Sequence, residues 1–173
     1  MIRLARRSTL AALLCLLLTD CAGYHLGANR PTFMEGVRVI AVPTARNETL
    51  VPRIEALVTD SIVRQLQLDG VYKVTDSLKD ADAVLECEIM KLTRTPGRSV
   101  LGDVLTTQEF NMTLSVHYRV IRKATGEVVD DRTAAGTTSF FVSSDVNQDE
   151  RQAIPLAAQG CGIRIASEIS EGW

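Results

Sequence analysis

The segment 110–120 constrains the fold of this chain more than any other part of the sequence. Apolar and polar residues alternate along it without a break. The residues on its apolar face are Phe110, Met112, Leu114, Val116, Tyr118 and Val120. Successive side chains of a β-strand point to opposite sides of the sheet, so the pattern predicts a strand with one face buried and one face in water. The fold must therefore cover one side of a sheet.

Four further segments are predicted to be strands. Residues 37–42 are β-branched and apolar and end at Pro43, and residues 71–74 form a short second strand. Residues 83–90 alternate in the same way as 110–120. The residues on their apolar face are Ala83, Leu85, Cys87 and Ile89. A tight turn at 123–127, with Gly126 at a position that favours positive φ, predicts that 128–142 returns antiparallel to 110–120.

Two segments are predicted to be amphipathic helices. The first runs from Pro52 to residue 68, and the second lies within 149–169. The apolar residues of the first stripe are Ile54, Leu57, Val58, Ile62 and Leu66, and those of the second are Ile154, Ala158, Cys161, Ile165 and Ile169. Pro155, Gly160 and Gly162 weaken the second helix, which predicts a start at Pro155 or a bend near the glycines.

The order of these elements predicts an α+β fold. Two helices would pack on one face of a mostly antiparallel four- or five-stranded sheet, which gives a two-layer sandwich. The first strand–helix–strand connection could add one parallel pair. Residues 95–107 contain Pro96 and two glycines and form a loop longer than most connections inside a domain, which makes this loop a candidate for function.

The N-terminus has the layout of an export signal. Three arginines precede an apolar run at 10–18 that is too short to span a bilayer as a helix. The following Leu-Thr-Asp-Cys at 18–21 resembles the lipobox of bacterial lipoproteins, although Asp20 departs from its usual small residue. This resemblance implies a signal peptide at 1–20, lipid attachment at Cys21 and an anchored tail at 21–35. The 153 residues left after the signal are enough for one domain, which we place at 36–173. Acyl chains on Cys21 would hold the chain durably in a membrane.

The net charge limits the kinds of partner that the chain can bind, and two cysteines remain in the predicted domain. Three Arg and one Asp of the 19 basic and 21 acidic residues lie in 1–20, so 16 and 20 remain. A weakly acidic domain lacks the basic surface of a nucleic-acid-binding protein, and it is not a broadly polybasic membrane-binding protein. Cys87 and Cys161 both face the predicted interlayer, where they are either disulfide-bonded or two buried free thiols.

The sequence does not point to catalysis, a metal or a cofactor. It contains no HExxH, CxxC or GxSxG pattern. Glu86 and Glu88 project from the same strand face and are expected to be solvated, and His25 and His117 lie in the tail and on a wet strand face. An unrelated hydrolase is therefore the weakest of the alternatives.

Basic residues form two groups at opposite ends of the predicted sheet, and either could bind anionic lipid through charge-assisted hydrogen bonds or be ordinary surface charge. The first group is Lys91, Arg94 and Arg98, and the second is Arg119, Arg122 and Lys123. Apolar residues in the long loop could contact a partner or an amphiphile, or fold back onto the core. These residues are Val100, Leu101, Val104 and Leu105.

Several short motifs together resemble one family. They are Cys21-Ala22-Gly23-Tyr24-His25-Leu26, Val39-Ile40-Ala41-Val42-Pro43, Asn47-Glu48-Thr49, Thr125-Gly126-Glu127-Val128 and Phe140-Phe141. They are similar to segments of the lipopolysaccharide-assembly lipoproteins (LptE-like). The resemblance implies a two-layer domain in the outer membrane, lipid-anchored and periplasm-facing. It would dock with the β-barrel that exports lipopolysaccharide, help to assemble it and contact lipopolysaccharide without performing a reaction.

A second resemblance gives the alternative. Ala81-Asp82-Ala83-Val84-Leu85 is similar to a strand of curli-secretion and Tol-associated lipoproteins, which implies an oligomeric export pore or scaffold. A pore needs long amphipathic hairpins that cross the membrane. Segment 110–120 is long enough, but its apolar face is needed to cover two helices. The sequence therefore favours the transport-assembly function.

Overall fold

The computed structural model describes residues 30–97, 108–143 and 145–172. Several predictions fall outside these residues. They are the signal peptide at 1–20, the lipid attachment at Cys21, most of the tail, Arg98 and the loop residues Val100, Leu101, Val104 and Leu105.

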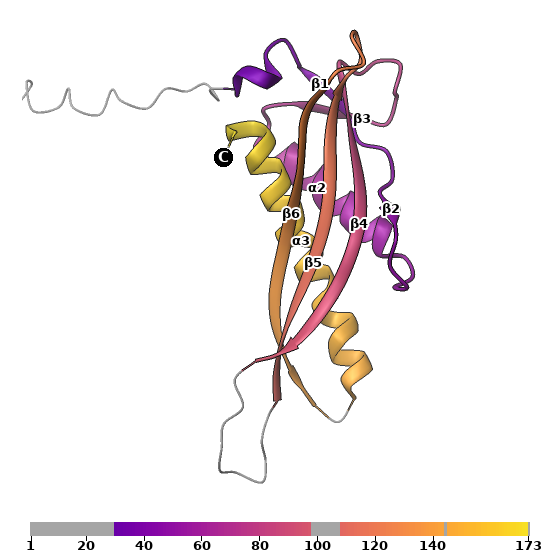
Figure 1. Ribbon diagram of the computed structural model, residues 1–173, viewed down its shortest axis with the longest axis vertical. Helices are drawn as coiled ribbons and strands as arrows, with labels where there is room; N and C mark the ends of the chain where they lie inside the picture. The colour runs from indigo at the N-terminus through magenta and orange to yellow at the C-terminus, as the bar shows by residue number, and fades with distance from the viewer. Residues whose placement is uncertain (1–29, 98–107, 144, 173) are drawn as a thin grey trace, which may run out of the picture.

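The centre of the molecule is a six-stranded mixed sheet (Figure 1). Its strand order is β3 (Lys73–Thr75), β1 (Val39–Ala41), β4 (Ala83–Pro96), β5 (Gln108–Arg122) and β6 (Val128–Val142), with β2 (Arg46–Asn47) also paired to β4. The long strands pair antiparallel, β4 with β5 and β5 with β6, as predicted. Gly126 in the β5–β6 turn has φ +71°, also as predicted.

The sheet is mostly antiparallel, as predicted, but it has six strands instead of four or five, and its short strands form more parallel pairs than the single one that the sequence allowed. Strand β1 pairs in parallel with both β3 and β4, and β2 pairs in parallel with β4. The chain leaves β1 through a helix and returns as β3, which makes the first pair parallel. Because β3 has only three residues, the short connection 76–82 is enough to bring the chain back to the start of β4.

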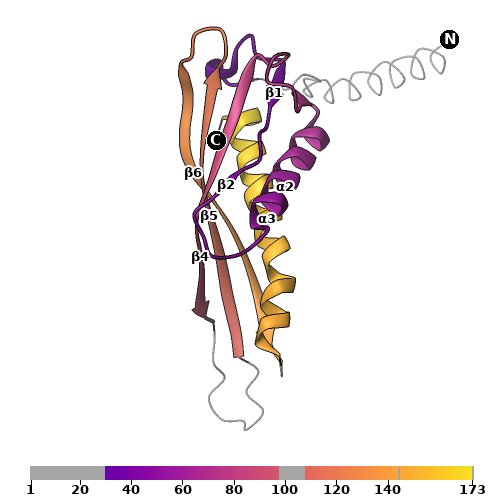
Figure 2. The same cartoon turned by 90° about the vertical axis from the view of Figure 1, so that its right-hand side faces the viewer.

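Two helices cover one face of this sheet, and the other face is open (Figure 2). They are α2 (Ile54–Asp69) and α3 (Val146–Glu171). Every predicted inward residue of β5 from Met112 to Val120 has no exposed surface, and the five predicted apolar residues of α3 are buried. In α2 the buried stripe is narrower than predicted, because Leu57 is 38% exposed and only the i, i+4 series Ile54, Val58, Ile62 and Leu66 is buried.

Helix α3 begins earlier than predicted and runs through Pro155. The Asp145 side chain accepts hydrogen bonds from the Asn147 and Gln148 amides, each 3.1 Å long, and so caps the first turn. Pro155 is exposed, so the carbonyl that loses its partner there can bind water. The helix lies very close to β6 at Gly136, where a Cβ would overlap the Ala157 carbonyl and the Cys161 amide.

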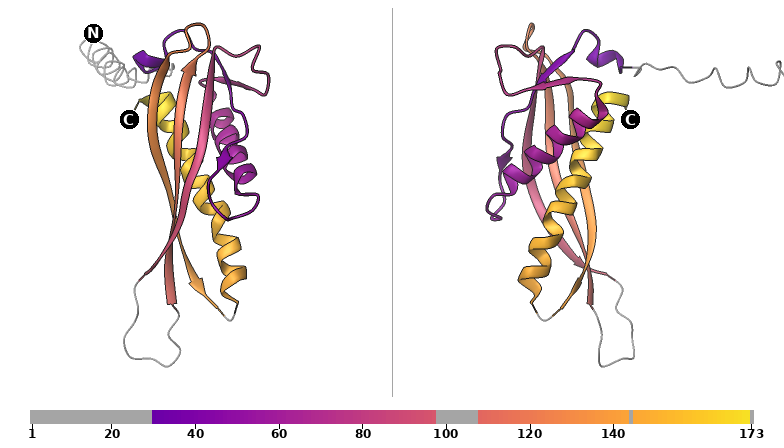
Figure 3. Two further views of the ribbon diagram at one scale, coloured as in Figure 1. Left: turned by 45° about the vertical axis from the view of Figure 1, so that its right-hand side comes forward. Right: turned by 180° about the vertical axis from the view of Figure 1, so that it is seen from behind.

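The molecule is elongated and has two different ends (Figure 3). At the hairpin end lie the β5–β6 turn, the short 3-10 helix η2 (Thr32–Met34) and the last turn of α3. At the distal end lie Gly97, Gln108 and the first turn of α3. Strand β5 runs between the two ends, and its 15 residues correspond to about 50 Å.

Candidate functional site

At the distal end, an arginine lies against an aromatic pair. Arg94 follows Leu92 on the inward face of β4, and its guanidinium carbon lies 5.3 Å from the centre of the Phe110 ring. Phe110 stacks on Phe140 of β6, with ring centres 6.0 Å apart. The Arg94 guanidinium also forms a 2.9 Å ion pair with Glu150 of α3. Both side chains keep solvent access, with 42% and 30% of their surfaces exposed. An anion in solution can therefore reach Arg94.

The predicted grouping of Lys91 with Arg94 is not found. Two residues three apart on a strand point to opposite faces, and Lys91 lies on the open face opposite Ser115. An irregularity in the register between Ile89 and Lys91 sets which face each one takes. The predicted loop also begins later than residue 95, because β4 continues to Pro96. Of the predicted group, Arg94 alone lies at the inward distal surface within the described residues.

The basic residues of the hairpin end are bound to other parts of the protein. Arg119 forms a 2.8 Å ion pair with Glu86 on the open face. Arg122 donates to the Glu35 carbonyl at 2.9 Å and to the Phe33 carbonyl at 3.0 Å, and Lys123 donates to the Lys79 carbonyl. These three cations therefore connect neighbouring segments instead of forming one patch.

A buried polar network at the hairpin end was not predicted. Tyr118 donates to Glu168 of α3 at 2.7 Å, and its oxygen lies 3.3 Å from Asp130 of β6. Arg164 donates to the same Glu168 at 2.6 Å, and Arg132 binds both oxygens of Asp130 at 2.7 Å. Burial, and then the hydrogen bond to Glu168, raise the pKa of Tyr118 strongly. The network ties β5, β6 and α3 together.

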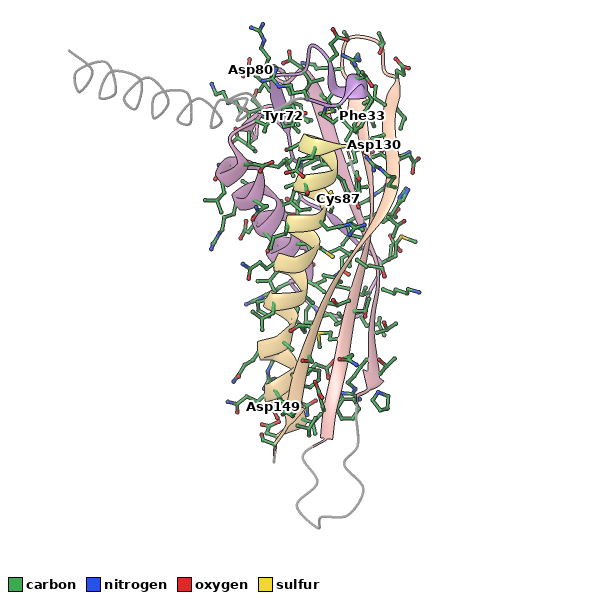
Figure 4. The ribbon with its side chains drawn as sticks, turned by 90° about the vertical axis from the view of Figure 1, so that its left-hand side faces the viewer. Phe33, Tyr72, Asp80, Cys87, Asp130 and Asp149 are labelled. Atoms are coloured by element: carbon green, nitrogen blue, oxygen red, sulfur yellow. The ribbon has the colours of Figure 1, made fainter. Side chains whose placement is uncertain are left out.

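A sequence signal for this network did exist. Asp130 and Arg132 lie opposite Val120 and Tyr118, so the alternation places both charged residues on the covered face. Charged residues on a covered face are rarely left unpaired, so they predict partners within the core. The side chains of Asp130 and Glu168 are only 9% and 7% exposed. Figure 4 shows Asp130 near Phe33 at the hairpin end, with Asp149 at the distal end.

The open face of the sheet has two zones. Toward the hairpin end it is charged: His117 contacts Asp131 at 2.7 Å, close to the Arg119–Glu86 pair. Toward the distal end, strand pairing brings together hydroxyl and amide side chains. These residues are Thr93, Thr95, Asn111, Thr113, Ser115, Thr137 and Ser139. Charged residues lie at the borders of this zone, Lys91 opposite Ser115 and Glu109 opposite Phe141. This face is the wet side of the sheet that the alternation predicted.

A pocket of about 410 Å³ lies beside the charged zone. Its lining residues are Pro43, Thr44, Arg46, Glu86, Cys87 and Arg119. It forms where the parallel ladder on β4 is interrupted, since β1 pairs with Ala83 and Val84 and β2 resumes at Glu88. The contribution of Arg46 could not be predicted, because a two-residue strand has no recognisable pattern.

Cys87 and Cys161 are free, buried thiols, so the disulfide that the sequence allowed is not formed. The Cys161 thiol donates to the Leu114 carbonyl at 3.3 Å, whereas Cys87 lies opposite Tyr118, four residues farther along β5. Four residues of a strand are about 13 Å, so the two cysteines lie at different levels of the interlayer. Burial raises the pKa of Cys87 to about 12 and that of Cys161 to about 11.

The described residues contain neither a metal-binding cluster nor a membrane-spanning helix. Within residues 30–97, 108–143 and 145–172, no group of three or more His, Cys, Asp or Glu side chains could hold a metal ion. Across the same residues, every helix is too short or too polar to cross a membrane.

A family model identifies the family of the chain. The family model described as "LptE: Lipopolysaccharide-assembly" matches residues 37–161, which is more than half of the chain. No curated protein matches the sequence significantly.

Solved structures resemble the fold at low identity. A hypothetical protein from Chlamydia trachomatis has a TM-score of 0.54 and 16% identity, and the match covers 77% of this chain and 96% of that one. A putative neuraminyllactose-binding hemagglutinin homolog from Helicobacter pylori has a TM-score of 0.53 and 13% identity, with 86% and 93% covered. At this identity the likeness concerns the fold alone.

Proposed function

Because this chain belongs to the LptE family of lipopolysaccharide-assembly proteins, we propose that it docks with the β-barrel that exports lipopolysaccharide through the outer membrane. It would support the assembly of that barrel and the delivery of lipopolysaccharide to the cell surface. The observation that carries this proposal is the family match over residues 37–161, which spans both sheet edges and most of α3. The family serves in assembly, so the role proposed here is binding and not catalysis.

The proposed function includes a lipid anchor. Residues 1–20 would be removed and Cys21 would carry the acyl chains. The tail would be shorter than the 21–35 expected from the sequence, because residues 30–35 already belong to the fold at the hairpin end. Growth with labelled palmitate tests this part. We expect label on the mature protein and none on a Cys21→Ser variant, because the thioether needs the cysteine sulfur. An unlabelled mature chain that begins far from residue 21 would contradict the anchor.

The distal end is the best-supported place for contact with an anionic amphiphile. Exposed ion pairs contribute no more than about 1 kcal/mol, so a phosphate can displace Glu150 from Arg94 at little cost. The Arg94 guanidinium can then bind two phosphate oxygens. Phe141, which is 60% exposed, adds apolar surface at the same end but on the open face, since Phe140 is the residue that faces inward. Arg98 is proposed as a second cation here, and Lys91 and the hairpin-end cations as weaker sites.

Charge reversal tests this contact. We expect Arg94→Glu combined with Arg98→Glu to weaken lipopolysaccharide binding at least tenfold, since each replaced cation becomes a repelling carboxylate. Arg64→Glu with Lys73→Glu, two exposed residues outside the distal end, makes the same change in net charge and is the control. Circular dichroism should be unchanged in both variants. If the distal pair binds as tightly as the control pair, the distal end is not the lipid site.

Docking through the distal end is tested by photo-crosslinking. Val100, Leu101, Val104 and Leu105 are the proposed partner-contact residues. A photoreactive residue at Phe141 should capture a large barrel protein, because this side chain is exposed at the same end. The matched position is Leu68, which is 74% exposed on α2. Capture from Leu68 and none from Phe141 would place the contact on the helix layer.

The alternative, a self-assembled export pore, needs β5 for a different purpose. The inward side chains of β5 from Met112 to Val120 have no exposed surface, so they are already part of the core. A strand that crosses a membrane must present its apolar side chains to lipid. The same residues cannot serve both purposes in one folded state, which favours the docking function.

A further inference from the structure

The first described residues are firmly held at the hairpin end. The segment Arg30–Val37 contains η2, whose turn is closed by hydrogen bonds from Met34 to the Pro31 carbonyl and from Glu35 to the Thr32 carbonyl. Met34 and Val37 have no exposed surface. Chain segments near a terminus are poorly ordered unless something ties them down. This segment is therefore part of the folded core.

Two arginines from neighbouring strands hold the segment. Arg122 of β5 bridges the carbonyls of Phe33 and Glu35 with its two terminal nitrogens. The guanidinium carbon of Arg132 of β6 lies 5.7 Å from the centre of the Phe33 ring, and two hydrogen bonds to Asp130 hold the guanidinium in place. A planar guanidinium can make both kinds of contact, whereas an ammonium cannot bridge two carbonyls in the same way. We call Arg30–Val37 with Arg122 and Arg132 the N-terminal clasp.

The clasp also contacts the segment that contains Val71 and Tyr72, just before β3. Arg30 donates to the Val71 carbonyl at 3.1 Å and lies 5.6 Å from the centre of the Tyr72 ring. Tyr72 in turn donates to the Ile169 carbonyl of α3 at 3.1 Å. Segments from both halves of the chain thus hold one short stretch (Figure 4).

We propose that the N-terminal clasp sets the reach of the tether, an inference that rests on the proposed lipidation of Cys21. With the clasp closed, only residues 22–29 separate the anchor from the folded domain, and they span at most about 28 Å. The hairpin end is then the tethered end, and the distal end, about 50 Å along β5, is the free one. Release of residues 30–37 would add about 28 Å and double the reach.

Hydrogen exchange on the full-length lipoprotein in nanodiscs tests the clasp. The amides of Met34, Glu35 and Val37 should be protected in the wild type. In Phe33→Ala with Arg122→Ala they should exchange at least tenfold faster, while β5 stays protected. Arg119→Ala, on the same strand but the open face, should leave them unchanged. Wild-type amides that exchange freely, or a double variant that behaves like the wild type, would overturn the clasp.

If the double variant fails to fold, Arg122→Lys gives the same test. Lysine keeps the charge but has one nitrogen in place of the two that bind the Glu35 and Phe33 carbonyls, so the bridge should weaken and the same three amides should exchange faster than in the wild type. Unchanged exchange in a folded Arg122→Lys protein would contradict the role of the bridge.

Energy transfer measures the reach itself. A donor dye on Ala124→Cys in the exposed β5–β6 turn, with acceptors on the lipid headgroups, should transfer less energy when the clasp is opened by the double variant. Equal transfer despite faster exchange would overturn the proposed control of reach. A Cys21→Ser protein should leave the nanodisc whether or not the clasp is closed. If the Cys21→Ser protein stays bound to the nanodisc, Cys21 is not the anchor, whereas the hydrogen-exchange result for the clasp is unaffected.

Discussion

The two ends of the molecule contain the same kinds of residue in different surroundings. At the hairpin end Arg132 lies over Phe33 and pairs with Asp130, whose side chain is 9% exposed. At the distal end Arg94 lies over Phe110 and pairs with Glu150, which is 30% exposed. The two arginines are similarly exposed, at 35% and 42%, so the difference lies in the burial of their carboxylate partners. Arg132 is needed to neutralise a nearly buried carboxylate and holds the fold together, whereas Arg94 can exchange an exposed carboxylate for another anion.

The largest effect on stability is expected from Arg132→Ala. The change leaves Asp130 without its cation in a nearly buried position, and the cost should be about 2–3 kcal/mol, below the range for fully buried pairs because Arg132 is 35% exposed. Urea unfolding followed by circular dichroism measures this loss. A loss under about 0.5 kcal/mol would mean that the Arg132–Asp130 pair contributes no more to stability than an exposed ion pair such as the one at the distal end.

Removal of one hydroxyl should have the next largest effect. Tyr118→Phe takes away the 2.7 Å hydrogen bond to the buried Glu168 and should lower the free energy of unfolding by about 1–2 kcal/mol. The neighbouring His117→Ala, on the open face, is the control and should stay within about 0.5 kcal/mol of the wild type. If the two variants unfold at the same urea concentration, the network contributes little.

Alkaline pH should lower the free energy of unfolding through Tyr72, which lies at the hairpin end. Burial raises the pKa of Tyr72 to about 12, from 10.0 for a free tyrosine. The folded state therefore favours the neutral phenol, and this contribution is complete below pH 10 and is lost as the pH rises toward 12. At pH 11 the loss from this group should be about 1 kcal/mol relative to pH 9. A Tyr72→Phe protein should lose less over the same range, and an equal loss would exclude Tyr72 as its source.

The smallest effect on stability is expected at the distal end. Arg94→Ala breaks an ion pair between exposed side chains and should cost less than about 1 kcal/mol. Salt should reduce even this difference, because exposed pairs are screened. Thermal unfolding at low and high salt measures both quantities. A cost as large as that of Arg132→Ala would show that Arg94 is a structural residue and not an accessible one.

Regular segments could be predicted from the sequence because their patterns are long. The alternation of 110–120 predicted the inward residues of β5 correctly, and the five residues of the α3 stripe are all buried, although the buried face of α3 is wider and has eleven residues. The connection through a helix allowed the parallel pair of β1 with β3, but the parallel pairing of β1 and β2 with β4 could not be predicted, since strands of two or three residues carry no period. The start of α3 was placed too late because capping by Asp145 outweighs the break at Pro155.

The positions of the basic residues were predicted better than their partners. Register put Arg94 near the start of β5 and the other group near the hairpin, as expected. The partners of Arg122 are carbonyls 87 and 89 residues away in the chain, and no local pattern connects such groups. Whether a cation is accessible depends on such distant contacts, so the sequence alone could not separate Arg94 from Arg122.

Native mass spectrometry of the tagged lipoprotein, extracted from outer membranes with mild detergent, tests the proposed docking most directly. We expect one copy of the chain, carrying its acyl chains, in complex with one large β-barrel protein. A ring that contains only copies of this chain, or a free monomer without acyl chains, would contradict the proposed function.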